Sequence, residues 1–242
     1  LCWLHPVLAD NQKARLLELL LERLRNETTR IAAIKTLSSV AEGISTVGPV
    51  DLSPILADAL TDMASFLKLH SRSLKQTALE SMDIVTTNHG AGLADGALFS
   101  SVVQEFTPLI VDSDLHVAHL TLSVAVSILK VCPSAGSAIK DQMLEPALLL
   151  TVSSLLQDYA LQSLVAFFKQ LVLSEAVAFK ELLGLLRERL SDGVGKQGIY
   201  NLAECIAAVT ATTTTDLRKK FLDELLALLE TGETPPDASR LR

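Results

Sequence analysis

The sequence predicts an all-α fold in which antiparallel helix pairs stack into a superhelix. Two features of the 242 residues carry this prediction. Hydrophobic residues make up 49% of the chain and aromatic residues only 4%, so the apolar mass is mostly aliphatic and suits many packed helices. In addition, one apolar pattern returns along the chain at nearly constant intervals, which is the sequence signature of a repeat architecture.

Five apolar segments align on one leucine each. The aligned residues are Leu37, Leu79, Leu122, Leu164 and Leu202, so the steps are 42, 43, 42 and 38 residues. The residue three positions after each leucine is always apolar, and the residue seven positions after it is apolar in four of five cases. This spacing forms a stripe on one face of an α-helix. A period of roughly 40–47 residues built from two helices predicts a HEAT-repeat α-solenoid.

Each aligned helix has a helical segment before it, as a helix pair requires. The first is preceded by "QKARLLELLLERLR", and a last segment of this kind, "DLRKKFLDELLALLE", has no partner. We therefore expect an array of about five and a half repeats over residues 1–231, followed by a disordered, proline-rich tail at 232–242. The expected repeats are 11–47, 53–90, 97–132, 135–174 and 177–210, with a half repeat at 214–231.

Polar residues and prolines mark the expected starts and bends of the helices. Asn26, Ser71 and either Asp112 or Ser113 precede second helices and are of the types that cap free backbone amides. Three prolines fall in first helices: Pro54 early enough to start one, and Pro108 and Pro146 further along, where a proline bends a helix.

The composition argues against several classes of partner. The net charge is −7 and the isoelectric point is near 5.2, so electrostatic binding of nucleic acid is not expected. The longest uncharged apolar window, from Leu115 to Leu129, is shorter than the roughly 20 residues that cross a bilayer. The chain begins without a methionine or a signal peptide and looks like a piece of a longer protein.

Three cysteines stand far apart, and no pair has the spacing of a zinc site. Their odd number also argues against a disulfide framework, so we expect an intracellular, reducing environment.

Two histidines could form a metal site. His116 and His119 are three residues apart on one helix face, and Asp112 and Asp114 lie just upstream. The segment lacks the glutamate of the H-E-x-x-H pattern, and no third ligand is evident. We favour a structural or partner-facing role, and keep an α-helical metalloenzyme as an alternative.

No other motif supports catalysis. "DGVGKQG", Asp192 to Gly198, contains a G-x-G-x-x-G, but a dinucleotide site would need a buried strand before it, and "ELLGLLRERLS" is helical and charged. We expect no enzyme activity, no cofactor and no small-molecule substrate.

Five ordered segments resemble one known family. They are "LLERLRNETTRIAAIKTLSSVA" from Leu20, "SFLKLHSRSLKQTALESMDIV", "LIVDSDLHVAHL", "YALQSLVAFFKQLV" and "KQGIYNLAECIAAVT". Together they resemble the middle of the cullin-associated, neddylation-dissociated protein family over about Leu19 to Thr210. The resemblance implies a long HEAT solenoid that wraps the unmodified cullin–RING-box complex, competes with the substrate-receptor adaptor and acts as an exchange factor in the cytoplasm and nucleus. This piece would be the central arch.

Second helices of HEAT pairs usually line the concave side, so their polar residues are the expected partner contacts. The candidates are Arg30, Arg72, Lys75, Gln76, His116, His119, Tyr200 and Asn201. Another HEAT adaptor, such as a nuclear transport carrier or a phosphatase scaffold, remains the alternative.

Overall fold

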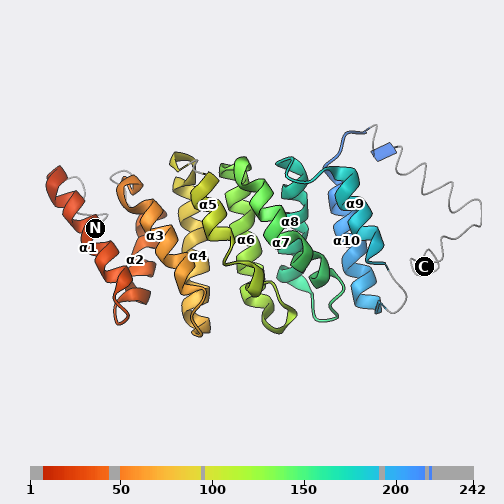
Figure 1. Cartoon of the computed structure of the whole chain (residues 1–242), viewed down its shortest axis with the longest axis horizontal. Coiled ribbons are helices and arrows are strands. Elements are labelled where there is room, and N and C mark those ends of the chain that lie inside the picture. The colour runs from red at the N-terminus through yellow and green to blue at the C-terminus, as the bar shows by residue number, and fades with distance from the viewer. Residues whose placement is uncertain (1–7, 44–49, 94–95, 191–193, 216–217, 220–242) are drawn as a thin grey trace, which may run out of the picture.

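A computed structural model describes residues 8–43, 50–93, 96–190, 194–215 and 218–219. Within these residues every regular element is helical, which confirms the prediction of an all-α HEAT-repeat solenoid (Figure 1). The α-helices are α1 (Asp10–Arg25), α2 (Arg30–Ala41), α3 (Ser53–Phe66), α4 (Arg72–His89), α5 (Gly96–Val103), α6 (Leu115–Val131), α7 (Gly136–Thr151), α8 (Asp158–Leu173), α9 (Phe179–Glu188) and α10 (Lys196–Ala211). Most of the expected half repeat at 214–231 and the tail at 232–242 lie outside the described residues.

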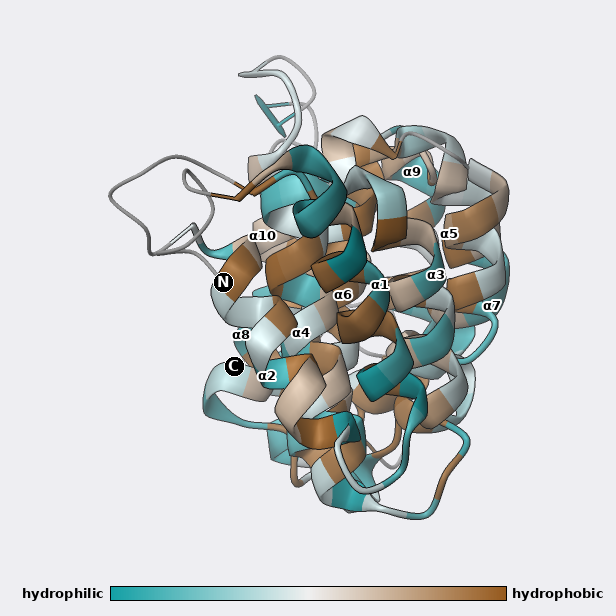
Figure 2. Ribbon diagram, turned by 90° about the vertical axis from the view of Figure 1, so that its left-hand side faces the viewer, coloured by the Kyte–Doolittle hydropathy of each residue, from teal (hydrophilic) through white to brown (hydrophobic). Residues whose placement is uncertain are grey.

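The helices form two rows with the core between them. α2, α4, α6, α8 and α10 pack against one another in sequence, and α1, α3, α5 and α7 form a parallel row. Figure 2 looks along the array and shows second helices such as α2, α4 and α8 on the left and first helices such as α3, α5 and α7 on the right. The aligned Leu37, Leu79, Leu122, Leu164 and Leu202 are all buried in this core, as the stripe predicts.

Ion pairs join neighbouring repeats along the surface. Arg25 of α1 reaches Asp62 of α3 at 2.7 Å, and Lys140 of α7 reaches Glu181 of α9 at 2.7 Å. Exposed pairs of this kind contribute little free energy each, about 0–1 kcal/mol. Their contribution is geometric, because each one fixes a point on one repeat against a point on the next. The other links are Arg25–Asp58, Lys68–Glu105, Arg72–Asp114 and Arg189–Glu145.

The expected helix caps are right in one case of three. Ser71 caps α4, and its hydroxyl accepts a hydrogen bond from the amide of Leu74 at 3.3 Å. Asn26 does not cap α2; it ends α1, and its side chain accepts from the amide of Thr28. Asp114, rather than Asp112 or Ser113, caps α6 by accepting from the amide of Val117 at 3.2 Å, because residues 112–114 form a 3₁₀ turn that delays the helix start.

The prolines follow the expectation in two cases. Pro54 lies in the first turn of α3, and Pro146 lies inside α7. The position expected for Pro108, late in a first helix, is wrong. α5 ends at Val103, and Pro108 lies in a separate 3₁₀ turn, Thr107–Leu109. In a continuous helix Pro108 could not donate to the carbonyl of Gln104 and its ring would clash with that carbonyl, so the α-helix does not run through this segment and the repeat has a first helix of only 8 residues.

One stretch of the described residues, Asp112–Val131, is long and apolar enough to cross a membrane by length and composition alone. It consists of α6 and the turn before it, and half of it is buried inside the structure. α6 packs against α4 on one side and α8 on the other. A helix enclosed in this way is expected to be apolar on most of its faces, so burial accounts for its composition.

Candidate partner-binding surface

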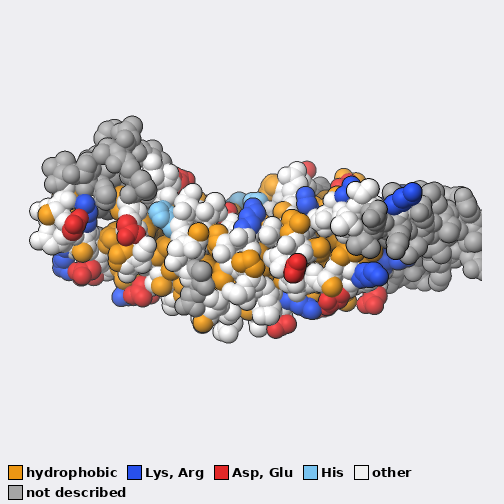
Figure 3. Space-filling view, turned by 90° about the horizontal axis from the view of Figure 1, so that it is seen from above, with side chains coloured by type: hydrophobic (Ala, Val, Ile, Leu, Met, Phe, Trp, Pro, Cys, Tyr) orange, Lys and Arg blue, Asp and Glu red, His pale blue; other side chains and the backbone are white. Residues whose placement is uncertain are grey.

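The exposed side chains of the second-helix row form the candidate surface. Seen from above in Figure 3, the molecule is bowed, and the side on which this row lies is hollowed near the middle. Histidine and basic side chains lie at this hollow. Because α4, α6 and α8 meet at the centre of the array, their first turns bring residues from three repeats together.

Three rings form an aromatic cluster there, consisting of His116, His119 and Tyr159. The ring centroids of the two histidines are 6.1 Å apart. Tyr159, from the first turn of α8, meets both edge-on, at 5.0 Å from His119 and 6.1 Å from His116. Such edge-to-face contacts add a modest stabilisation beyond burial. Tyr159 keeps 52% of its surface exposed, so the cluster leaves a partly apolar side chain open to solvent.

His119 is held between two neighbouring repeats. Its Nδ1 hydrogen-bonds the hydroxyl of Ser163 on α8, which ties the third repeat to the fourth. Burial lowers the pKa of His119, and the neighbouring His116 lowers it further, while Asp83 of α4 acts in the opposite direction. The folded protein therefore favours the neutral imidazole.

The lowered pKa of His119 predicts a small loss of stability in weak acid. The unfolded histidine titrates near 6.5, so as pH falls below that value the unfolded chain takes up the proton first and folding becomes less favourable. The loss stops growing once pH falls below the folded pKa. Urea unfolding of the wild-type chain and of His119→Gln at pH 7.5 and 5.5 measures the effect. We expect a smaller loss for the variant; equal losses would contradict the assignment.

Arg72 and Asp114 form a two-pronged ion pair at the same place. The guanidinium of Arg72 donates to the two carboxylate oxygens of Asp114 at 2.5 and 2.9 Å, joining α4 to the start of α6. This pair lowers the pKa of Asp114 and raises that of Arg72. In the amide orientation that satisfies both groups, Gln76 also accepts from Arg72 at 3.1 Å. Lys75 is partly exposed and has no ion pair among the described residues, so its charge is open to a partner.

The guanidinium of Arg30 is engaged by contacts within the protein. Its guanidinium donates to the carbonyls of Leu24 and Arg25 at the end of α1, each at 3.3 Å. The guanidinium carbon also lies 4.4 Å from the ring centroid of Phe66. The last carbonyls of a helix lack partners within the helix, so Arg30 serves the turn between α1 and α2.

Tyr200 and Asn201 are adjacent in sequence but differ in solvent exposure. Tyr200 is 55% exposed, and its pKa is raised by the charge of Glu204 one turn further along α10. The expectation that Asn201 is exposed is wrong: it is fully buried. Its amide donates to the carbonyls of Thr151 and Ser153 at 3.2 and 3.1 Å, and its oxygen accepts from Gln197 at 2.9 Å. Asn201 thus fixes the end of α7 to the next repeat.

Sequence reasoning missed Tyr159 and Ser163. Both belong to the aligned segment "YALQSL", in which Ala160 and Leu161 mark the buried face. That pattern places Tyr159 at the edge of the stripe, next to the helix start, where an aromatic residue is exposed. The signal was therefore present for Tyr159, whereas the contact of Ser163 with His119 depends on how two repeats dock.

The described residues do not assemble a metal or nucleotide site. They contain no group of three histidine, cysteine or carboxylate side chains placed to hold one ion, so the pair His116–His119 has no third ligand there. The glycine motif near Gly198 is preceded by helix α9 rather than by a strand, so it lacks the context that binds a dinucleotide. Its first glycine, Gly193, lies outside the described residues.

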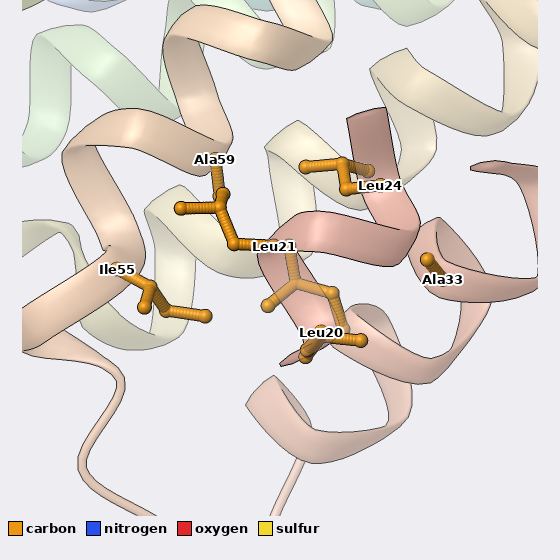
Figure 4. Close-up of a pocket in the computed structure, with 7 residues that line it drawn as sticks. Leu20, Leu21, Leu24, Ala33, Ile55 and Ala59 are labelled. Carbon is orange, nitrogen blue, oxygen red and sulfur yellow. The ribbon is translucent and has the colours of Figure 1, made fainter. Parts of the chain in front are cut away.

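A second hollow, between the first three helices, is a packing seam. Figure 4 shows it lined by Leu20, Leu21 and Leu24 of α1, with Ile55 and Ala59 of α3 opposite. Every lining side chain is apolar, and the space has no room for a water molecule. It offers no group that could orient a ligand, so the second-helix surface remains the candidate site.

The comparison with curated proteins decides the family. The chain is 34% identical over 228 residues to cullin-associated NEDD8-dissociated protein 1 of Dictyostelium discoideum, which aligns with 90% of it. It is 36% identical over 204 residues to cullin-associated NEDD8-dissociated protein 2 of Rattus norvegicus, covering 80% of the chain, and 30% identical to the Drosophila melanogaster protein 1, covering 93%. The chain is a segment of the cullin-associated NEDD8-dissociated family. No family model matches it.

The chain represents only part of the length of its family members. It covers 18% of the Dictyostelium protein, 16% of the rat protein and 20% of the Drosophila protein. Among solved structures, an engineered protein superposes with a TM-score of 0.57 over 93% of this chain and 94% of its own, at 15% sequence identity. At that identity the likeness concerns the fold alone, and it agrees with the helix-pair architecture.

Proposed function

We propose that this chain is a non-catalytic scaffold segment of a cullin-binding HEAT-repeat protein that regulates assembly and substrate-receptor exchange of cullin–RING ubiquitin ligases. The observation that carries the proposal is its identity of 30–36% to proteins named for association with cullins, over 80–93% of the chain. The proposed partner is the unmodified cullin–RING-box complex, bound by the full-length protein in the cytoplasm and nucleus. Cys132 and Cys205 are free, buried thiols, which suits such a reducing environment.

The stacking of the repeats supports a role in shaping the full protein. In a solenoid each repeat contacts only its neighbours, so curvature follows from many small, local rotations. The links Arg72–Asp114, Lys140–Glu181 and Arg189–Glu145 constrain those rotations between successive repeats. A segment of this kind sets the distance and angle at which the remaining parts of the protein meet a partner.

The concave side supplies the proposed contacts. We assign them to the aromatic cluster His116, His119 and Tyr159, together with Lys75 and Tyr200, because these side chains are exposed or partly exposed on the second-helix row. Aromatic residues are frequent at the energetically important centres of interfaces. Arg30 and Asn201 are removed from the proposed contacts, since their polar atoms are already used within the fold.

Binding to a purified unmodified cullin–RING-box complex tests the proposal. We expect the full-length protein to bind, and the substrate-receptor adaptor to weaken binding. Tyr159→Ala in the full-length protein is expected to weaken binding of the complex about fivefold to tenfold. This corresponds to a loss of roughly 1–1.4 kcal/mol of binding free energy, as expected when an interface residue is truncated. Titration calorimetry or surface plasmon resonance measures both effects.

The control is Lys180→Ala. Lys180 is exposed on α9, a first helix, away from the second-helix row, so its removal should leave the affinity for the complex unchanged. A full-length protein that does not bind the complex at low salt would overturn the proposed function. If Tyr159→Ala and Lys180→Ala both bind like the wild type, the partner is real but the contacts assigned to this segment are wrong.

A further inference from the structure

A groove opens on the other side of the array, between the third and fourth repeats. It has a volume of about 400 Å³. Ile110, Val111 and Asp112 line it on the side of the third repeat, and Glu145, Pro146 and Leu149 of α7 line it on the other. None of these residues belongs to the aromatic cluster or to the contacts proposed above.

The groove lies beside the segment that follows the short first helix of the third repeat. α5 has 8 residues, whereas α3 has 14 and α7 has 16. After Val103 the chain passes through the 3₁₀ turn Thr107–Leu109 and becomes extended at Val111. This non-helical segment, rather than a continued helix, faces α7 across the groove.

Two of the apolar side chains that line this opening are unusually exposed. Leu149 is 54% exposed and Val111 is 40% exposed, although Ile110 and Leu150 beneath them are buried. These leucine and valine side chains remain in contact with water. A large apolar side chain entering the groove would remove water from several of them at once.

The charge at the rim has one sign. Among the described residues, the charged side chains that line the groove are the carboxylates of Asp112 and Glu145. Asp112 accepts a hydrogen bond from the hydroxyl of Ser153 at 3.2 Å and has no basic partner among the described residues. Arg189 donates to the carboxylate of Glu145 at 2.6 Å. The Glu145 side chain is 61% exposed, so the pair is weak and a basic group of a partner can compete with Arg189 for this carboxylate.

We propose that this groove docks a short segment of a partner protein in which a large apolar side chain is flanked by lysine or arginine. The apolar side chain fills the space between Val111 and Leu149, and the basic group meets Asp112. The proposal goes beyond the proposed function, because it concerns a different surface and makes no use of a cullin. An acidic or uncharged segment would leave Asp112 without a counterion, so the basic flank sets the specificity.

Selection from a displayed library of random short peptides tests the proposal on the complete chain. We expect the enriched peptides to carry a leucine-sized or aromatic residue next to lysine or arginine. Replacing the basic residue by glutamate in the best peptide should weaken binding at least tenfold, measured by fluorescence polarisation. Leu149→Arg in the protein should do the same, and Asp112→Asn should weaken binding about threefold and reduce its dependence on salt.

A matched control is available on α8. Leu173→Arg introduces the same change at a leucine that is 58% exposed and outside the groove, and it should bind the peptide like the wild type. Thermal unfolding followed by circular dichroism should be unchanged for both arginine variants, because both leucines are on the surface. Failure to enrich any peptide, enrichment of peptides without a basic residue, or equal binding to Leu149→Arg would each overturn the proposal. None of these outcomes bears on the cullin assay.

Discussion

Replacing the buried Asn201 by leucine is expected to lower the free energy of unfolding by about 3 kcal/mol, since buried polar groups left without partners cost roughly 1–3 kcal/mol each. Asn201 donates to the carbonyls of Thr151 and Ser153, at the point where α7 ends. In Asn201→Leu the carbonyl of Thr151 would lose its donor, and the carbonyl of Ser153 would keep only the longer hydrogen bond from the amide of Leu156 at 3.4 Å. Urea unfolding monitored by circular dichroism measures the loss.

The adjacent residue provides the control for that experiment. Tyr200→Ala removes an exposed side chain from the same helix and should change the free energy of unfolding by less than about 0.5 kcal/mol. If Asn201→Leu unfolds like the wild type, or if it lowers partner affinity while leaving stability intact, then Asn201 is a contact residue and its assignment as a structural link is wrong.

The variant Thr107→Val is expected to lower the free energy of unfolding by about 2 kcal/mol, because a partly buried carbonyl loses its donor and an unpaired acceptor shielded from water costs roughly 1–3 kcal/mol. Pro146 lies inside α7 and has no amide hydrogen, so the carbonyl of Gln142 four residues earlier lacks its usual helical partner. The hydroxyl of Thr107, from the preceding repeat, donates to that carbonyl at 2.8 Å. The proline thus creates an acceptor in one repeat that the neighbouring repeat satisfies.

A double-mutant cycle with Pro146→Ala tests this coupling. Alanine restores the amide hydrogen, so Gln142 regains a helical partner and Thr107→Val should then cost less than about 1 kcal/mol. Equal costs in the two backgrounds would show that the hydroxyl of Thr107 acts independently of the proline. Chemical denaturation of the four proteins in the cycle provides the measurement.

Several features of the fold could be predicted because they depend on local sequence. The apolar stripe through Leu79 and Leu122 repeats at helical spacing, so the helices and their buried faces follow from periodicity. Ser71 is predictable as a cap because its hydroxyl bonds an amide three residues away. His116 and His119 share a face for the same reason, and the structure brings their rings together.

The early end of α5 was not predictable from the same signals. Residues 104–110 continue an apolar pattern that is compatible with a helix, and only the backbone shows that Pro108 falls beyond the helix end. The groove beside Leu149 lies against that non-helical segment, so neither the opening nor the exposure of its lining could be read from spacing alone. Tyr159 joined the aromatic cluster because α8 docks against α6, a contact 40 residues or more apart in sequence.

The sequence by itself determined the class of fold, the approximate repeat and the family resemblance, because helix periodicity and local caps are encoded within a few residues of one another. The tertiary structure alone decided which polar side chains are open to a partner. Arg30 and Asn201 are as polar as Lys75 and Tyr200, yet the first two are held by carbonyls at the ends of neighbouring helices. Those carbonyls become acceptors only where a helix stops, and the residue that reaches them is fixed by how the helices pack against each other.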